Sequence, residues 1–368
     1  MDKKQIVLQA LTNVRYPGTG KNIVESEMVQ PADITVDGNK VCVNIHFDRP
    51  TDPFVKSIIK AAETAVNTFG DPALEIKGNV TPLYRQQLPP VSDKPLKDVK
   101  NIIAVSSGKG GVGKSTVAAN LAVALAAEGY KVGLLDADIF GPSVPKMFGI
   151  EDYQLYMHKV DGRDLIIPAE RYGVKILSIG FLVDKNNAVI WRGAMASNAL
   201  KQLISDVDWG ELDYFLIDMP PGTSDIHLTL VQQLPITGAV IVSTPQEVAL
   251  ADARKGIAMF REPKINVPVL GIVENMAWFT PERHPDERYY LFGREGAANL
   301  AKELGVPLLA QIPVTEVICD SGDSGHPVAL DSNITAQAFT HLAHEVVDAV
   351  CHRKTTIHTS QAVLTKYR

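Results

Sequence analysis

Residues 106–116 have the sequence SSGKGGVGKST, which contains four glycines and two lysines. Residues 108–115 fit the pattern G-x-x-x-x-G-K-[ST], and the segment follows an apolar run and opens a helical pattern. In such a loop, backbone N–H groups and the positive end of the helix surround phosphates. The lysine reaches the β- and γ-phosphates, and the following hydroxyl binds Mg²⁺. The stretch therefore predicts a nucleoside triphosphate site made of Gly108, Lys109, Gly110, Gly111, Val112, Gly113, Lys114, Ser115 and Thr116.

The same glycines also satisfy G-x-G-x-x-G over residues 108–113, the pattern of dinucleotide-binding folds. Asp136 follows the next apolar run, where such a fold places its ribose-binding acid. A hydride-transfer site has no use for the pair Lys114–Ser115, so these two residues favour the phosphate loop.

Three acids, Asp136 among them, follow apolar runs that resemble buried strands. Asp218 ends LDYFLID and is expected to hold Mg²⁺, usually through water, whereas Asp213 begins that run and would lie at the wrong end of the sheet. Asp136 and Asp138 follow KVGLL. We expect these two to orient the attacking water and to bind the water shell of the metal, with helix or turn capping as the alternative. The turn at 220–222, PPG, is either a sensor of the γ-phosphate or a stiff turn.

From about residue 101 the chain alternates apolar runs with helical patterns. The expected strands are NIIAVSS, KVGLLDA, VKILSIG, LDYFLIDM, GAVIVST, VPVLGIVEN and VPLLAQIP, with the closing helix near NITAQAFTHLAHEVVDAV. Continuous apolar strands separated by helices predict an α/β fold with a mostly parallel sheet covered on both faces. Ligands of such sheets bind at the carboxyl ends of the strands.

Residues 1–80 predict a separate small α+β domain: a helix over KKQIVLQALTNV, a hairpin around Asp37-Gly38, a helix over DPFVKSIIKAAETAVNTFG and a last strand in ALEIKGNV. Residues 81–100 contain four prolines and little periodicity, which is typical of a linker. The expected domains are thus 1–80, a linker at 81–100, an ATPase-type domain at 101–352 and a polar tail at 353–368.

Composition narrows the class of protein. The chain has 368 residues, 45% of them apolar, and a net charge of −6, which disfavours a general nucleic-acid binder. Its three cysteines form no C-x-x-C pair, and the amino terminus has no apolar segment typical of a signal peptide. We therefore expect a cytoplasmic protein with neither a nucleic-acid nor a membrane partner.

The motifs together resemble a known family. KGGVGKST resembles the deviant phosphate loop of the MinD/ParA/ArsA class, and DADIFGPSVPKMFG, WRGAMASNALKQL, LDYFLIDMPPGTSDIHLTL, VPVLGIVENMAWF and SGDSGHPV resemble the Mrp/ApbC iron–sulfur cluster carrier ATPases. Residues 1–80 look like the iron–sulfur-assembly-type domain that is often fused in front of bacterial members.

The resemblance implies an Mg²⁺-dependent ATP hydrolase that pairs as a homodimer through its nucleotide site and passes iron–sulfur clusters to apoproteins. It implies that Lys109 reaches the partner's nucleotide, that Lys114 and Asp138 act in hydrolysis, and that Ser115, Asp136 and Asp218 surround the metal. Asn275 would contact adenine, although a strand-end turn residue is the alternative.

One feature departs from the family pattern. Members that carry a [4Fe–4S] cluster usually have a C-x-x-C soon after ENM, but the sequence here is ENMAWFTPERHPDERYYLFG. His284 in this slot resembles a solvated loop residue, Cys42 is expected to pack in its strand, and Cys319 is expected to be buried or incidental. Three alternatives stay open: other cluster ligands, transient delivery, or an ATP switch with changed cargo. A MinD/ParA-like positioning ATPase is the alternative function.

Overall fold

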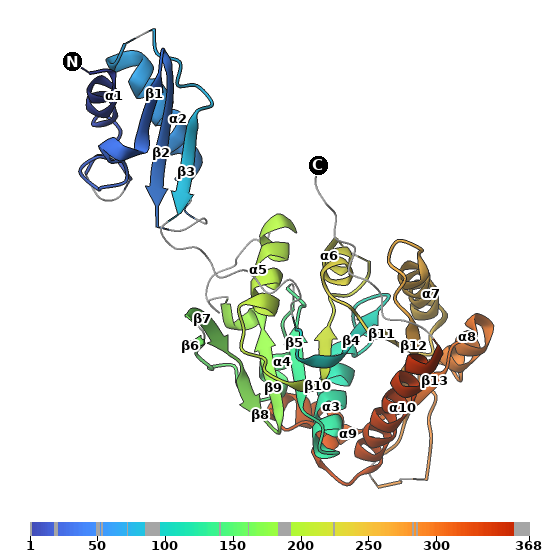
Figure 1. Cartoon of the computed structure of the whole chain (residues 1–368). Helices are drawn as coiled ribbons and strands as arrows, with labels where there is room; N and C mark the ends of the chain where they lie inside the picture. Colours follow the sequence, from blue (N-terminus) through green and yellow to red (C-terminus); the bar gives the residue numbers. More distant parts are fainter. Residues whose placement is uncertain are drawn as a thin grey trace. The chain divides into compact units, whose positions relative to one another are not determined.

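The computed structural model describes residues 2–356, apart from positions 18–20, 49–51, 53, 72, 85–95, 140, 161, 183–192, 224, 282 and 285. The chain divides into two compact units, Met1–Asp93 and Lys94–Arg368, and each has its own apolar core (Figure 1).

The first unit packs two helices against a small sheet. Its elements are α1 (Lys3–Leu11), the short 3₁₀ helix η1 (Pro31–Asp33), β1 (Ile34–Asp37), β2 (Lys40–Phe47), α2 (Val55–Phe69) and β3 (Val80–Tyr84). The sheet order is β1-β2-β3; β1 and β2 form the predicted antiparallel hairpin, and β3 runs parallel to β2. Both predicted helices are present, but the predicted last strand is displaced, because β3 starts at Val80.

Strand β2 corrects the prediction for Cys42. Val41, Val43, Ile45 and Phe47 alternate along β2 and are buried, so they form the core face of the strand. Cys42 falls on the opposite face and is exposed, because successive side chains of a strand point to opposite sides. The alternation that suggested packing therefore applies to its neighbours and not to the thiol.

The second unit contains an eight-stranded sheet of order β13-β12-β11-β4-β10-β5-β9-β8. Seven strands are parallel and β8 is antiparallel to β9. The bounds are β4 (Val99–Ser107), β5 (Val132–Asp136), β8 (Ala169–Arg171), β9 (Val174–Ser178), β10 (Leu212–Asp218), β11 (Gly238–Ser243), β12 (Val269–Phe279) and β13 (Leu308–Val314). All seven predicted strands are present, which confirms the α/β fold with a mostly parallel sheet.

Helices cover both faces of this sheet (Figure 1). They are α3 (Lys114–Ala127), α4 (Val144–Met147), α5 (Gly193–Ser205), α6 (Asp225–Gln233), α7 (Glu247–Arg261), α8 (Gly296–Leu304), α9 (Glu316–Ser324) and α10 (Ile334–Thr356). One core joins the sheet to α3 and α10, and a second core joins its other face to α5, α6, α7 and α8. The apolar strands are buried on both sides, as parallel strands require.

Several elements differ from the sequence expectations. A hairpin of β6 (Tyr156–Val160) and β7 (Arg163–Ile167) was not predicted; the short 3₁₀ helices η2 (Ile179–Leu182) and η3 (Val328–Leu330) were also missed. β12 continues past Asn275 to Phe279, and α10 continues to Thr356. The strands β3 and β4 extend into the region 81–100 from its two ends. No helix in the described part of the chain is both long and apolar enough to cross a bilayer.

Candidate nucleotide site

The loop of residues 108–113 joins the carboxyl end of β4 to the amino end of α3. β4 lies between β10 and β11, so the loop opens at the middle of the sheet. Gly111 and Gly113 have φ values of 81° and 78°, which L side chains rarely adopt. A Cβ atom at Gly113 would lie 2.2 Å from Nδ2 of Asn275, and one at Gly108 would lie 2.2 Å from the carbonyl carbon of Asp252 in α7. The glycines therefore permit both the turn and its close packing.

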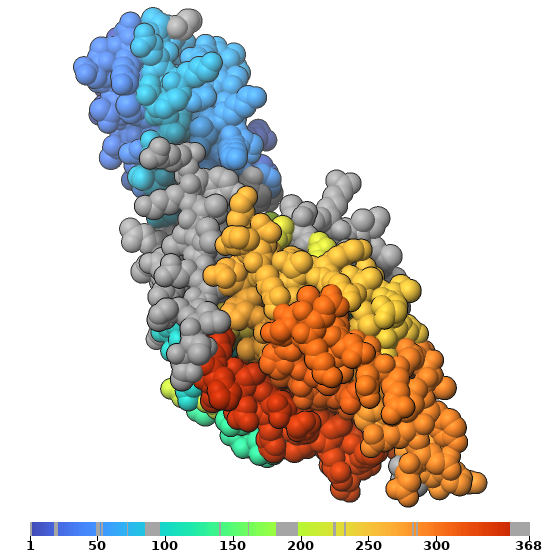
Figure 2. Space-filling view, turned by 90° about the vertical axis from the view of Figure 1, so that its right-hand side faces the viewer, coloured from blue at the N-terminus to red at the C-terminus, as the bar shows by residue number. Residues whose placement is uncertain are grey.

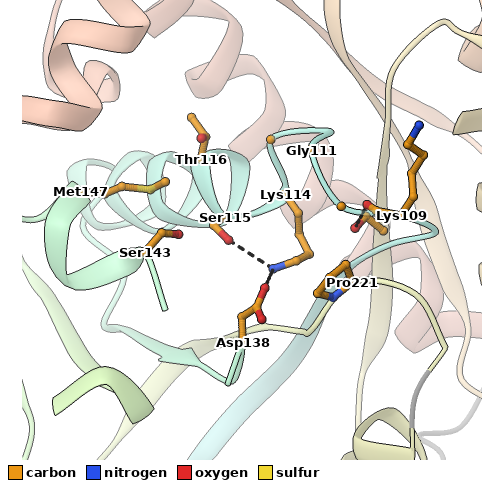
Figure 3. A pocket seen from close by; sticks show the side chains of 12 residues that line it. Lys109, Gly111, Lys114, Ser115, Thr116, Asp138, Ser143, Met147 and Pro221 are labelled. Carbon is orange, nitrogen blue, oxygen red and sulfur yellow. Dashed lines mark hydrogen bonds and ion pairs between the residues drawn. The ribbon is translucent and has the colours of Figure 1, made fainter. Parts of the chain in front are cut away.

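This loop borders a cavity of about 230 Å³ (Figure 3). Its lining residues come from the loop, from the start of α3, from α4 and from the ends of neighbouring strands: Ser107, Lys109, Gly110, Gly111, Gly113, Lys114, Ser115, Thr116, Asp138, Ser143, Met147 and Pro221. Most of the predicted loop residues therefore line this one cavity. Gly108 and Val112 are not among its lining residues.

Lys114 is buried at the floor of the site. Its ammonium donates to Oδ1 of Asp218 and to the Ser115 hydroxyl at 3.2 Å, and it lies 3.8 Å from Oδ2 of Asp138 (Figure 3). Asp218 is fully buried, and burial raises the pKa of its carboxyl although the adjacent Lys114 opposes that shift. The lysine is thus held by one acid at the end of β10 and one in the segment that follows β5.

Asp136 lies behind this cluster at the end of β5. Its Oδ2 accepts hydrogen bonds from the Ser178 hydroxyl at 2.9 Å and from the Val144 N–H at 3.3 Å, and its Oδ1 accepts from the Asp138 N–H at 3.1 Å. Burial, reinforced by the charge of Asp218, raises the pKa of Asp136 to about 7. Asp136 therefore holds the backbone that carries Asp138, and it does not line the cavity. This is the turn-capping role that the sequence analysis gave as the alternative for Asp136.

The oxygen atoms here suit a magnesium ion. Oδ1 of Asp138 and Oδ2 of Asp218 are buried, and no hydrogen-bond partner for either is found among the described residues; the Ser115 hydroxyl contacts the same lysine ammonium as these two acids. Carboxylate, hydroxyl and water oxygens are the ligands that Mg²⁺ prefers, and it usually keeps several waters. Asp213 lies at the start of β10, where it pairs with Lys100 at 2.8 Å, so it takes no part in this cluster.

Asn275 contacts the loop directly. It is buried, and its Nδ2 donates to the carbonyl of Val112 at 2.8 Å. This contact fixes the end of the phosphate loop, and the adenine contact stays a prediction. Gly222 contacts the residue before the loop, since its N–H donates to the carbonyl of Ser107, the last residue of β4, at 3.0 Å.

Lys109 differs from Lys114. Its side chain extends away from the cluster of Lys114 and Asp138 (Figure 3), and no hydrogen bond or ion pair of its ammonium occurs within the described residues. Its carbonyl accepts from the Ser107 hydroxyl at 2.9 Å, which holds the backbone while the side chain is directed outward.

Sequence reasoning missed Ser143, Met147 and Ser178. Ser143 and Met147 reach the cavity from the short helix α4 and the residue before it, and Ser178 ends β9 beside Asp136. The only available signal was the position of Ser178 after an apolar run, at the same edge of the sheet as the acids.

The three cysteines lie on three different elements, β2, α9 and α10. Cys42, Cys319 and Cys351 are all free and exposed, which excludes the buried interpretation of Cys319 and leaves the incidental one. His284 is exposed, 3.6 Å from Glu287, as expected of a solvated loop residue. Within the described ranges, no three side chains of His, Cys, Asp or Glu converge to hold a metal ion.

A parallel sheet, a glycine loop that opens a helix, and a buried lysine beside acids from neighbouring strands define a phosphate-loop nucleotide-binding protein. Comparisons with known proteins agree. Residues 98–347 match the family described as NUBPL iron-transfer P-loop NTPase, and residues 4–72 match an iron–sulfur cluster assembly protein family. The chain therefore belongs to the family of NUBPL-type iron-transfer P-loop NTPases.

Relatives span nearly the whole chain. An iron–sulfur cluster carrier protein of Synechocystis is 42% identical over 347 residues, covering 94% of this chain and 97% of the relative. An iron–sulfur cluster transfer protein NUBPL of Dictyostelium discoideum is 40% identical, covering 84% of this chain and 93% of the relative. The structure of a nucleotide-binding protein from Archaeoglobus fulgidus in complex with ADP is 41% identical, with a TM-score of 0.57 over 66% of this chain and 95% of that one.

Proposed function

We propose that this protein is an ATP-hydrolysing carrier that binds iron–sulfur clusters and passes them to apoproteins in the cytoplasm. The observation that carries the proposal is the buried cluster of Lys114, Asp138 and Asp218 at a phosphate loop. It occurs in a chain that matches relatives named as cluster carriers along nearly its full length. Both family matches, one to each unit, support the same conclusion.

The hydrolysis step follows from the positions of these side chains. Lys114 would exchange its acids for the β- and γ-phosphates, because phosphate oxygens are stronger partners for a cation that faces the cavity. Asp138 would accept a hydrogen bond from the attacking water. The water oxygen bonds to the γ-phosphorus as the bond to the β-bridging oxygen breaks, and ADP leaves with the electron pair.

Ser115 and Asp218 would hold Mg²⁺, with Asp136 positioned behind its water shell. The ion would neutralise charge that develops on the phosphate oxygens. Asn275 is proposed to contact adenine through the part of its amide that is not bonded to Val112.

Lys109 supports a homodimer in the proposed mechanism. Its side chain is directed away from its own catalytic cluster and lies at the rim of the cavity (Figure 3). An outward lysine at this position suits insertion into the site of a second copy, where it would stabilise transition-state charge as an arginine finger does. ATP would then hold two chains together, and hydrolysis would loosen them.

The cargo is inferred from the family, whereas the side chains that would bind it are inferred from the cysteines of this chain. Residues 277–293, where related carriers have their C-x-x-C, contain no cysteine, so the thiols open to a cluster are Cys42, Cys319 and Cys351, all of them exposed. Iron–sulfur clusters are held mainly by thiolates. We propose that two chains share a cluster through such exposed thiols or hold it transiently.

The test is anaerobic reconstitution of the full chain with iron and sulfide, with iron and sulfide counted per chain. The loaded protein is then mixed with an apoprotein that needs a [4Fe–4S] cluster, and the recovery of that protein's activity is measured with and without Mg·ATP. We expect loading and transfer, and replacement of all three cysteines by serine should remove both.

Two results would contradict this proposal in different ways. Iron content unchanged by the triple replacement would exclude cysteine ligation. If the parent chain hydrolyses ATP but fails to load or transfer a cluster, the proposed ATPase activity stands and iron–sulfur clusters are rejected as its cargo.

A further inference from the structure

The backbone of Lys109 lies between two glycines, Gly108 and Gly110, which gives the phosphate loop conformational freedom at this point. Gly108 is held by packing, because a Cβ atom there would lie 2.2 Å from the carbonyl carbon of Asp252 in α7, the helix whose outer surface is amber in Figure 2. At Gly110 an added Cβ atom would meet nothing within 4 Å. The chain is therefore packed tightly before Lys109 and loosely after it.

The Ser107 hydroxyl supplies a hydrogen bond where this packing ends. It donates to the carbonyl of Lys109 at 2.9 Å, and among the described residues Ser107 has the only side chain that is hydrogen-bonded to the backbone of residues 108–111. The direction of this carbonyl fixes the peptide plane after Lys109, and with it the direction in which the lysine side chain leaves the loop. Figure 3 shows that the side chain extends away from the cluster of Lys114 and Asp138.

Ser107 is itself held firmly by its surroundings. It is the last residue of β4 and pairs with Val242 in the neighbouring strand β11. Its carbonyl accepts from the Gly222 N–H at 3.0 Å, in the turn that follows β10. The residue is only 1% exposed, so its side chain has little room to change rotamer. The hydroxyl is therefore a rigid attachment point for the carbonyl of Lys109.

We infer that Ser107 is a positioning residue for Lys109, and that its hydroxyl holds the loop so that the lysine enters the nucleotide site of a second chain. The inference rests on the proposed function, in which Lys109 stabilises transition-state charge in trans. A charged group acts there only when it is placed accurately, since a misplacement of about 1 Å can cost roughly 10²-fold in rate. Ser107 also borders its own cavity, but its hydroxyl donates to the Lys109 carbonyl, so its effect appears in the partner's site.

The first test compares two neighbouring serines. Ser107→Ala should lower kcat for ATP hydrolysis about tenfold, as expected when one hydrogen bond that acts only in the transition state is lost. Its affinity for ADP, measured by titration calorimetry, should stay within about twofold of the parent. Ser106→Ala is the control, because Ser106 is equally buried but lies on the other face of β4 and outside the cavity lining. Both quantities should stay within about twofold for this control. Thermal unfolding checks that both variants fold.

Mixed dimers separate an effect in trans from an effect in the serine's own site. A Lys109→Ala chain keeps its own phosphate site but offers no lysine to its partner. An Asp138→Asn chain offers Lys109 but lacks the acid that orients the water. In a dimer of the two, only the site of the Lys109→Ala chain is complete, and its lysine comes from the Asp138→Asn chain. The rate of ATP hydrolysis by the mixture therefore reports on one kind of site whose lysine donor is known.

Ser107→Ala is then added to one of the two chains at a time. In the Asp138→Asn chain, which donates Lys109, it should lower the rate of the mixture about tenfold. In the Lys109→Ala chain, which holds the complete site, it should leave the rate within about twofold. Both mixtures contain the same substitution at the same protein concentration, so a general loss of stability would lower both rates alike.

A loss confined to the mixture in which Ser107→Ala is in the chain with the complete site would assign the serine to its own nucleotide and overturn the inference. Equal losses in the two placements, or no loss in either, would overturn it as well. An inactive mixture without Ser107→Ala would reject the lysine in trans, and the inference with it. Failure of the proposed function is distinct from all of these results, because it would appear as a parent chain that does not hydrolyse ATP.

Discussion

Lys114 and Asp218 form an ion pair in which both side chains are buried, although they lie 104 positions apart in the sequence. The pair joins the first residue of α3 to the last residue of β10, and its acid comes from the strand next to the phosphate loop. Before a nucleotide arrives, the lysine that will bind phosphate already has an anion beside it. In the absence of nucleotide, the positive charge of Lys114 is therefore balanced mainly by Asp218.

Removal of one partner should destabilise the protein. Lys114→Met leaves the buried Asp218 carboxyl without its cation, so we expect the free energy of unfolding to fall by about 3 kcal/mol at neutral pH. Denaturant unfolding of the nucleotide-free chain measures this. The double variant Lys114→Met/Asp218→Asn should recover at least half of the loss, because no uncompensated acid remains. A double variant as unstable as the sum of the two single variants would contradict this account.

Two glycines allow a matched comparison. Gly113→Ala introduces a side chain at φ 78° and 2.2 Å from Asn275, so nucleotide affinity should fall at least about tenfold. Gly322→Ala, on α9 and outside the cavity lining, adds its methyl group where no atom lies within 4 Å, and its affinity should stay within about twofold of the parent. Titration calorimetry with ADP distinguishes the two variants. Equal losses in both would show that the contact with Asn275 does not shape the loop.

Lys109→Ala should separate binding from turnover. Since the Lys109 side chain is directed away from its own catalytic cluster, ADP affinity should change little, while the rate of ATP hydrolysis should fall roughly 10³-fold or more if the lysine acts as a finger in trans. Lys131→Ala, an exposed lysine near the opposite end of the sheet, is the control. Mixing Lys109→Ala with a Lys114→Ala chain should restore part of the activity through one complete site. Parent-like turnover of Lys109→Ala alone would reject the mechanism.

The buried Asp136 carboxyl should make stability depend on pH. Its pKa is raised to about 7 in the folded chain from an ordinary value of 3.8, so the unfolded chain loses this proton first. The contribution of Asp136 is therefore fully present below about pH 4 and is lost as the pH rises to about 7. We expect Asp136→Asn to gain stability relative to the parent over that interval, measured by denaturant unfolding without Mg²⁺ or nucleotide. Parallel curves for the two proteins would exclude this effect.

The phosphate loop could be predicted because its signal is local. Gly108 to Ser115 are consecutive, and the strand and helix on either side have clear apolar patterns. The acids Asp138 and Asp218 could be placed as well, because parallel strands end at one edge of the sheet. The contact of Asn275 with Val112 joins residues 163 positions apart, and no local pattern encodes it.

The errors have physical causes. β3 contains Pro82 and lies at the edge of its sheet, where a proline costs no ladder hydrogen bond; in the sequence, this proline suggested a linker. The hairpin of β6 and β7 is mostly exposed or half-buried, so its sequence lacks the alternation that marks a half-buried strand. Cys42 was misplaced because alternation alone does not say which of the two faces is covered.

The exposure of all three thiols has a practical consequence for handling the purified protein. Solvent-accessible cysteines on separate molecules can oxidise to intermolecular disulfides in air, and the product has the mass of a multimer. An oligomer observed by chromatography without a reducing agent would then result from oxidation during storage and not from the binding of ATP. Reductant-matched samples are needed before a shift in apparent size is attributed to nucleotide.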